Sequence, residues 1–112
     1  MRILTRNEEI ILVALCRLGG EAHGSALYMK MIELTGKSFV FGTLYNSLEY
    51  LNRKGYVDSK KGEPTPERGG KRKSIYTILP EGRDALLETR RFYERLWEDL
   101  SETKLRSGEI CR

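Results

Sequence analysis

The chain has 112 residues, of which 39% are hydrophobic and 32% charged, and its formal net charge is +4. This length suits one domain with one core, and the composition excludes an intrinsically disordered chain. No apolar run approaches the roughly 20 residues that a transmembrane helix needs, and the N-terminus carries no signal-peptide stretch, so we expect a cytoplasmic protein.

Cysteine and histidine are too few for a metal site or a disulfide framework. The chain holds one histidine and two cysteines that lie far apart, Cys16 and Cys111. A structural zinc site takes four ligands, so we expect neither a metal nor another cofactor. We interpret Cys16 as a core residue and Cys111 as a tail residue, with a redox role for either left open.

The first predicted helix begins after Thr5. Thr5 and Glu8 have the spacing of a capping box, and the glycine pair that starts at Gly19 is a typical helix end. The sequence between these signals leaves the helix almost no polar side. Such a helix must be covered on several sides, so we expect a partner subunit to cover part of it. The interface residues expected here are Ile11 and Leu15.

Two further helices are predicted over residues 25–34 and 41–54, separated by a short turn as in a helix-turn-helix. In the second of them, Leu44, Leu48 and Leu51 share one face, which is the expected core face. The opposite face carries Gly42, Asn46, Glu49, Tyr50 and Arg53, with Tyr45 at the flank.

A long hairpin is expected after these helices. Residues 56–60 and 74–79 are the predicted strands, and the prolines and glycines between them favour a loop. Residues 53–73 hold eight basic and three acidic side chains, which is the most positive stretch of the chain. Such a stretch suits contact with phosphates. Four of the cations fall within six residues of the loop: Arg68, Lys71, Arg72 and Lys73.

The last predicted helix has Pro80 in its first turn and continues to about Thr103. Leu86, Tyr93 and Leu100 recur every seven residues, as do Thr89 and Leu96, and this repeat is typical of helix-on-helix packing. We therefore expect residues 80–106 to form a dimerisation helix and residues 107–112 a disordered tail. The interface residues expected here are Leu86, Tyr93, Leu96, Trp97 and Leu100.

The order of elements predicts a mainly α protein with a small β-hairpin. Residues 1–79 would form a winged helix-turn-helix domain, followed by the long C-terminal dimerisation helix. The third helix can enter the major groove of B-DNA, about 12 Å wide, while the hairpin reaches flanking phosphates. Asn46 is a candidate for base contact because an amide pairs with adenine at two points. The expected DNA contacts are Thr43, Tyr45, Asn46, Arg53, Arg68, Lys71, Arg72 and Lys73.

Four short motifs occur in an order that points to a known family. They are His23-Gly24, Gly42-Thr43-Leu44-Tyr45, Arg68-Gly69-Gly70-Lys71-Arg72-Lys73 with Tyr76, and Pro80-Glu81-Gly82-Arg83. With this pattern the chain resembles the PadR-like winged-helix transcriptional regulators, in particular the compact members with one C-terminal helix. Lys71 and Asn46 stand where the family often has proline.

The resemblance implies a homodimer held by the first and last helices. It further implies binding to a pseudo-palindromic site on double-stranded DNA, repression that a small molecule relieves, and contact of Tyr45 with the DNA backbone. Trp97 is a candidate for stacking on a small aromatic effector, because ligand sites favour apolar hollows at interfaces. The alternative for Trp97 is plain interface packing.

Two functions other than DNA binding are alternatives for this sequence. The first is a winged-helix module that docks proteins and binds no DNA, because a fold does not determine a function. The second is an enzyme, which we do not expect. Gly36-Lys37-Ser38 resembles part of a phosphate-binding loop, but Met31 stands where that loop has its first glycine. A single histidine also leaves no nucleophile-and-base set.

Overall fold

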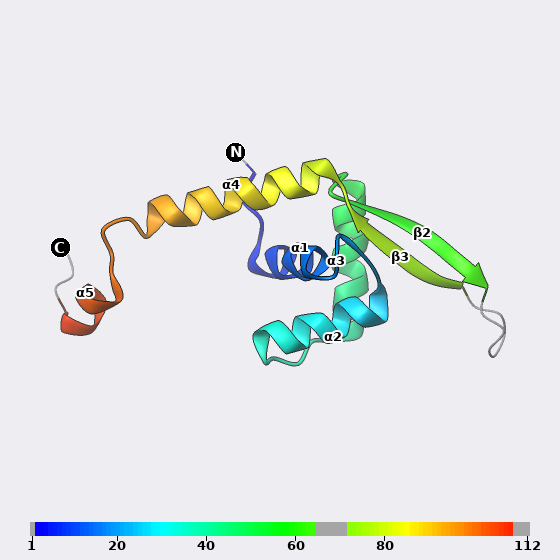
Figure 1. The fold of residues 1–112 in the computed structure, drawn as a ribbon, viewed down its shortest axis with the longest axis horizontal. Coiled ribbons are helices and arrows are strands. Elements are labelled where there is room, and N and C mark those ends of the chain that lie inside the picture. The colour runs from blue at the N-terminus through cyan, green and yellow to red at the C-terminus, as the bar shows by residue number, and fades with distance from the viewer. Residues whose placement is uncertain (1, 65–71, 109–112) are drawn as a thin grey trace.

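The structure is a computed structural model, and it describes residues 2–64 and 72–108. Three helices form the body, a β-hairpin extends from one side of it, and a long helix extends from the other side (Figure 1). This arrangement confirms the predicted fold class, a mainly helical winged helix-turn-helix. In chain order the elements are α1 (Arg6–Arg17), β1 (Glu21–His23), α2 (Gly24–Thr35), α3 (Phe41–Arg53), β2 (Val57–Pro64), β3 (Arg72–Ile78), α4 (Pro80–Leu96) and α5 (Glu102–Ser107).

The start of α1 is capped as predicted. The Thr5 hydroxyl accepts a hydrogen bond from the Glu8 backbone N–H at 3.2 Å, and the Glu8 carboxylate accepts one from the Thr5 N–H at 2.9 Å. Both are backbone donors that a helix start otherwise leaves unpaired. At the other end, Gly19 and Gly20 adopt φ values of +90° and +92°, which favour glycine. The two glycines turn the chain from α1 into β1.

The core lies where α1 meets α2, α3, β3 and α4. Ile11 and Leu15 are only 1% and 0% exposed there, so their predicted place in a dimer interface is wrong. The protomer's own elements cover α1, and these two side chains have no surface left for a partner. Cys16 was expected in the core, but it lies at the surface.

The sheet has three antiparallel strands in the order β1-β3-β2. β3 is the central strand, and its Tyr76 is opposite Ala22 of β1 and Ser59 of β2. β1 was not predicted from the sequence. The hairpin strands are also longer than predicted, and the backbone of Arg72 and Lys73 belongs to β3 rather than to the loop.

The C-terminal helix is shorter than predicted. α4 ends at Leu96, and Asp99 adopts a left-handed φ of 64°, which a continuing helix does not allow. The Ser101 hydroxyl then accepts a hydrogen bond from the Lys104 N–H at 3.0 Å and caps α5. The segment 80–106 is therefore two helices. Ser107, expected in a disordered tail, is the last residue of α5.

The first half of α4 packs into the body of the protomer. The Thr89 side chain is fully buried; its hydroxyl donates to the Ala85 carbonyl at 2.8 Å and accepts from the Leu4 N–H at 3.0 Å. Arg2 adds ion pairs to Glu81 at 2.7 Å and Glu88 at 2.8 Å. These contacts hold the chain's N-terminal segment against α4.

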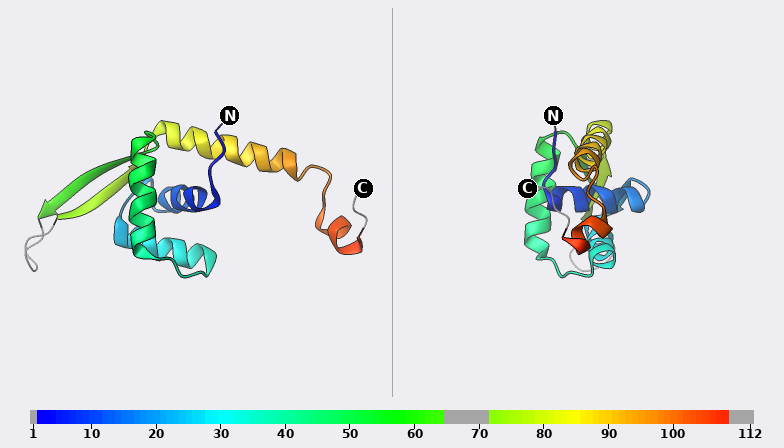
Figure 2. Two further views of the ribbon diagram at one scale, coloured as in Figure 1. Left: turned by 180° about the vertical axis from the view of Figure 1, so that it is seen from behind. Right: turned by 90° about the vertical axis from the view of Figure 1, so that its left-hand side faces the viewer.

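The C-terminal end of α4 extends away from the body, and α5 lies beyond it (Figures 1 and 2). The protomer measures 61 × 28 × 22 Å with a radius of gyration of 17.3 Å. A compact chain of this length has a radius of about 13 Å. Within the two described ranges, no helix is long and apolar enough to cross a membrane.

Candidate nucleic-acid interface

α3 is held by its inner face and exposes its outer face. Leu44, Leu48 and Leu51 are buried, which confirms the predicted core face. Asn46, Glu49 and Arg53 are exposed, and their spacing of three or four residues places them on one stripe of the helix. The Arg53 guanidinium pairs with the Glu49 carboxylate at 3.1 Å on this exposed face.

A charge contact holds the C-terminal end of α3 against the start of α1. The Lys54 ammonium lies 3.2 Å from the carboxylate of Glu8, which is buried, and 4.4 Å from the centre of the Tyr50 ring. Burial works against the ionised form of Glu8. The hydrogen bond from the Thr5 backbone and the Lys54 ammonium outweigh it, so the pKa of Glu8 is lowered. The contact joins α3 to the capping box of α1.

Aromatic side chains hold the N-terminal end of α3. The Phe41 ring lies 4.8 Å from that of Tyr28 and 4.9 Å from that of Tyr45, centre to centre, and the Tyr28 hydroxyl donates to the Phe39 carbonyl at 2.7 Å. The Tyr45 hydroxyl lies so close to the start of α2 that a Cβ atom on Gly24 would stand 3.2 Å from it. Tyr45 therefore packs between α2 and α3, and 43% of it stays exposed.

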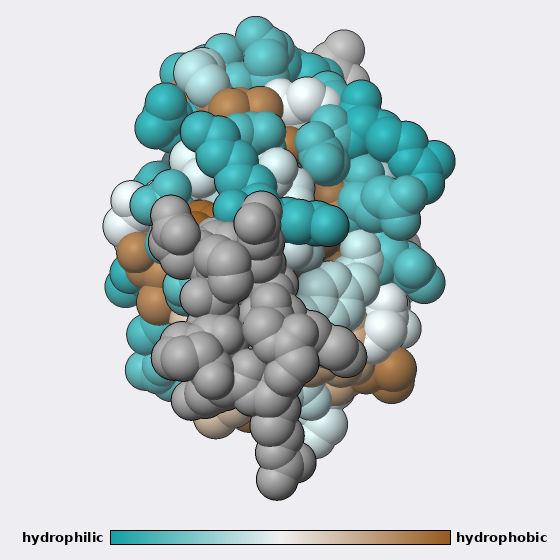
Figure 3. All heavy atoms as spheres, turned by 90° about the vertical axis from the view of Figure 1, so that its right-hand side faces the viewer, coloured by the Kyte–Doolittle hydropathy of each residue, from teal (hydrophilic) through white to brown (hydrophobic). Residues whose placement is uncertain are grey.

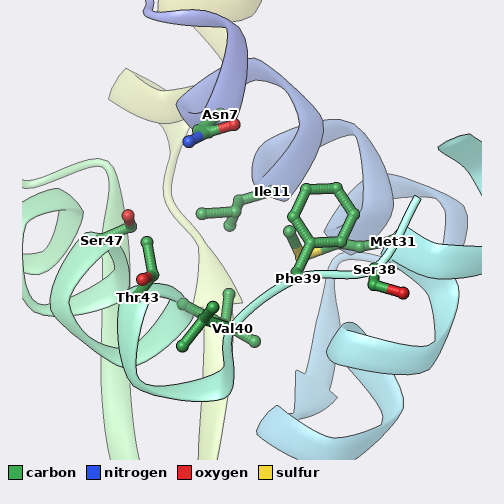
Figure 4. Close-up of a pocket in the computed structure, with 9 residues that line it drawn as sticks. Asn7, Ile11, Met31, Ser38, Phe39, Val40, Thr43 and Ser47 are labelled. Carbon is green, nitrogen blue, oxygen red and sulfur yellow. The ribbon is translucent and has the colours of Figure 1, made fainter.

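The four predicted DNA contacts on α3 are all exposed but do not lie on one stripe. Asn46 and Arg53 lie on the outer stripe, and Tyr45 lies beside the start of α2. Thr43 stands at the opposite edge, where it faces a hollow beside α1 (Figure 4). The structure thus brings Tyr45, Asn46 and Arg53 to the outer side of α3, and it places Thr43 at its border.

The hairpin that follows α3 carries further exposed basic residues. Lys60 and Lys61 of β2 are exposed and lie opposite Ile75 and Ser74 of β3. Neither lysine was singled out from the sequence, although both belong to its most positive stretch. Figure 3 looks from the hairpin side and shows hydrophilic residues over most of the upper half of the described surface. The predicted contacts Arg68 and Lys71 lie outside the described residues.

The interface residues predicted for the C-terminal segment fall into two groups. Leu86 and Tyr93 are half-buried within the protomer, and the Arg6 guanidinium lies 5.2 Å from the centre of the Tyr93 ring. Leu96, Trp97 and Leu100 are 57%, 54% and 38% exposed. The residues of the seven-residue repeat are therefore half-buried in the middle of α4 and exposed at its end and beyond it.

The described part of the chain holds no group of three or more histidine, cysteine or acidic side chains that could bind a metal. Its only described cysteine is Cys16, because Cys111 lies outside the described residues. Partial burial raises the pKa of the Cys16 thiol, while the charge of Arg83 opposes the rise.

Residues 11–88 match the transcriptional regulator PadR-like family. The fold is similar to that of a winged-helix DNA-binding protein from STIV, at 16% identity and a TM-score of 0.68 over 86% of this chain and 97% of that one. A transcriptional regulator from Clostridium thermocellum is similar at 23% identity and a TM-score of 0.66, over 94% and 92% of the two chains.

The Bordetella bronchiseptica protein BpsR, whose DNA binding is regulated by 6-hydroxynicotinic acid, is similar at 19% identity. Its TM-score is 0.61 over 93% of this chain and 73% of that one. No curated protein matches the sequence. At such identities the similarity to solved structures shows a common fold.

Proposed function

The chain belongs to the PadR-like family of transcriptional regulators, because the family match covers well over half of the chain. We propose that the protein is a homodimeric repressor, and that a small molecule releases it from its operator. Its family and fold are those of DNA-binding regulators, which are not enzymes. The observations that carry the proposal are the exposed polar stripe of α3 and the exposed lysines of β2, the strand that follows α3 in the chain.

The two parts of this interface have different tasks in the proposal. α3 enters the major groove, where the Asn46 amide contacts a base edge and Tyr45 and Arg53 contact the backbone. The hairpin follows the phosphates through Lys60, Lys61 and the four cations predicted from the sequence, Arg68, Lys71, Arg72 and Lys73. Lysine and arginine side chains suit phosphate contact, because neutralising a phosphate releases condensed counterions.

The exposed end of α4 supports the homodimer. Leu96, Trp97 and Leu100 lie at and just after the end of α4, and each leaves a large part of its apolar surface exposed. Pairing about a two-fold axis covers such a surface twice. The same axis would place two α3 helices on half-sites one helical turn apart, about 34–36 Å, or a multiple of it.

The effector is proposed to stack on Trp97 where two protomers meet. Support comes from the exposed indole at the proposed interface and from BpsR, a protein of similar fold whose DNA binding responds to 6-hydroxynicotinic acid. The competing role for Trp97 is packing between protomers without a ligand.

Salt titrations of binding to operator and to random duplex test the division of tasks. The operator is taken from genomic fragments that the purified protein retains. Asn46→Ala should cost roughly 1–3 kcal/mol on the operator and little on random DNA, because a base contact carries discrimination. Lys61→Ala should weaken binding to both duplexes and flatten the slope of log affinity against log salt by about 0.9. Lys104→Ala on α5 is the matched control and should change neither.

Two results would contradict the proposal. If Lys61→Ala loses discrimination while Asn46→Ala weakens both duplexes equally, the tasks of hairpin and helix are reversed. If the native protein shows no salt-dependent binding to any duplex, the chain is a protein-docking module instead.

A further inference from the structure

The hollow that Thr43 faces is a pocket within the helix-turn-helix. It is bounded by α1, by the connection between α2 and α3, and by α3, and its volume is about 170 Å³. In Figure 4, Asn7 and Ile11 enter it from α1, Phe39 and Val40 border it from the connection, and Thr43 and Ser47 face it from α3. Its walls therefore come from both helices that hold the recognition element and from the recognition helix itself.

The pocket is lined by apolar residues and by a smaller number of polar, uncharged residues. Five of the nine lining residues are apolar, and none of the nine carries a charge. The side chains of Asn7, Thr43 and Ser47 make no hydrogen bond to any other described residue, so their donors and acceptors are available to a ligand. A charged ligand would find no counter-ion here and would lose hydration on entering.

The volume limits the size of an occupant. An apolar cavity of about 150 Å³ holds one benzene molecule, so a hollow of this size takes a single ring and a small substituent. We propose that this pocket binds a neutral molecule with one aromatic ring and one hydroxyl or amide group. The ring lies against Ile11, Phe39 and Val40, and the polar group reaches Asn7 or Ser47.

This site is distinct from the one proposed at Trp97, and it deepens the proposed regulation. Its ligand would touch the connection that precedes α3 and one edge of α3, so a bound ring would bias where the recognition helix sits. An effect of the ligand on DNA binding rests on the proposed function, whereas binding of the ligand to the pocket does not. Ligand binding and regulation of DNA binding can therefore be tested separately.

Benzyl alcohol is the probe, with benzoate and benzylamine as charged analogues of similar size. Methyl NMR signals of the full chain report binding through Ile11 and Met31, which both line the pocket, while the Trp97 indole signal reports the other site. Benzyl alcohol should shift the two methyl signals saturably, with a dissociation constant of about 1 mM or below for so small a ligand. The charged analogues should bind at least tenfold more weakly.

Two variants of α3 separate filling of the pocket from a general effect. Ser47→Leu places a larger side chain in the hollow and should abolish the saturable shifts. Asn52→Leu makes a similar change at an exposed position outside the lining and should leave them intact. Circular dichroism and thermal unfolding identify a variant that fails to fold, and Asn7→Phe then fills the pocket from α1 instead.

The proposal is overturned if the Ile11 and Met31 signals do not saturate, if Ser47→Leu and Asn7→Phe bind like the native chain, or if the Trp97 indole alone responds. It is also overturned if the side chains of a second protomer already fill the hollow, which contacts between subunits in NMR spectra would reveal. Binding of the protein to a DNA duplex without any ligand tests the proposed function separately. If the protein bound no duplex, the proposed function would fail, but the proposal that the pocket binds an aromatic ring would still stand.

Discussion

Glu8 caps the start of α1 and joins it to the end of α3, and replacing Glu8 should remove both contacts. Its buried carboxylate accepts the Thr5 N–H at 2.9 Å and lies 3.2 Å from the Lys54 ammonium. A hydrogen bond to a charged group contributes about 1.5 kcal/mol at the low end of its range. Because the Lys54 side chain is 34% exposed, its ion pair contributes less, about 0.5 kcal/mol. Glu8→Ala should therefore reduce the free energy of unfolding by about 2 kcal/mol.

Glu8→Gln separates the two contacts. A glutamine still closes the capping box, but through a neutral hydrogen bond of about 1 kcal/mol, and it does not pair with Lys54, so this variant should lose about 1 kcal/mol at neutral pH. Glu33→Gln is the control, since Glu33 pairs with Lys30 at 2.9 Å but its side chain is 68% exposed. Urea unfolding is measured at one protein concentration, because dimerisation would make stability concentration-dependent.

The pH dependence has a defined sign. The folded pKa of Glu8 lies below its ordinary value of 4.5, so its charged form stabilises the fold above that pH. The advantage of native protein over Glu8→Gln should be complete above about pH 5 and disappear as the pH falls through the folded pKa. The reasoning is refuted if Glu8→Ala loses no more stability than Glu33→Gln, or if the native advantage persists in acid.

Three further changes have expected outcomes. A Cβ atom on Gly82 would overlap the Tyr56 carbonyl oxygen, so Gly82→Ala should cost roughly 2–3 kcal/mol in urea unfolding, whereas Gly42→Ala, in open space, should not destabilise. Leu100→Lys should leave an unpaired charge at the proposed interface, so sedimentation of this variant should shift towards the monomer. Leu34→Lys on α2 is the control and should not change the sedimentation. A native protein that sediments as a monomer at micromolar concentration would contradict the homodimer. Planar apolar compounds should quench Trp97 fluorescence saturably at micromolar concentration, and a broad panel without saturable quenching would leave the indole a packing role.

Sequence patterns predicted the elements whose signals are local. The capping box of Thr5 and Glu8 is confirmed, and the leucine repeat of α3 identifies the buried face of that helix. These predictions succeed because a helix start and a helix face are set by residues within a turn or two of each other. The resemblance to the PadR-like family is confirmed by the family match over residues 11–88.

The wrong predictions concern properties that depend on distant parts of the chain. Ile11 and Leu15 are apolar in a helix apolar on nearly every side, and only packing shows that the protomer itself covers them. Nothing in the residues around Asp99 breaks a helix as proline or glycine would, so the end of α4 could not be placed. β1 has three residues and exists through its pairing with β3, which lies more than 50 positions later.

That short strand has a consequence for the geometry of the complex with DNA. β1 leads directly into α2, and its partner β3 is one arm of the hairpin, so the root of the hairpin is bonded to the helix-turn-helix on the side away from β2. The base of the hairpin is therefore hydrogen-bonded to the strand that leads into α2, and we expect helix and hairpin base to approach the proposed half-site together. For the proposed homodimer, a different half-site spacing would then require bending of the DNA or a change in the angle between protomers.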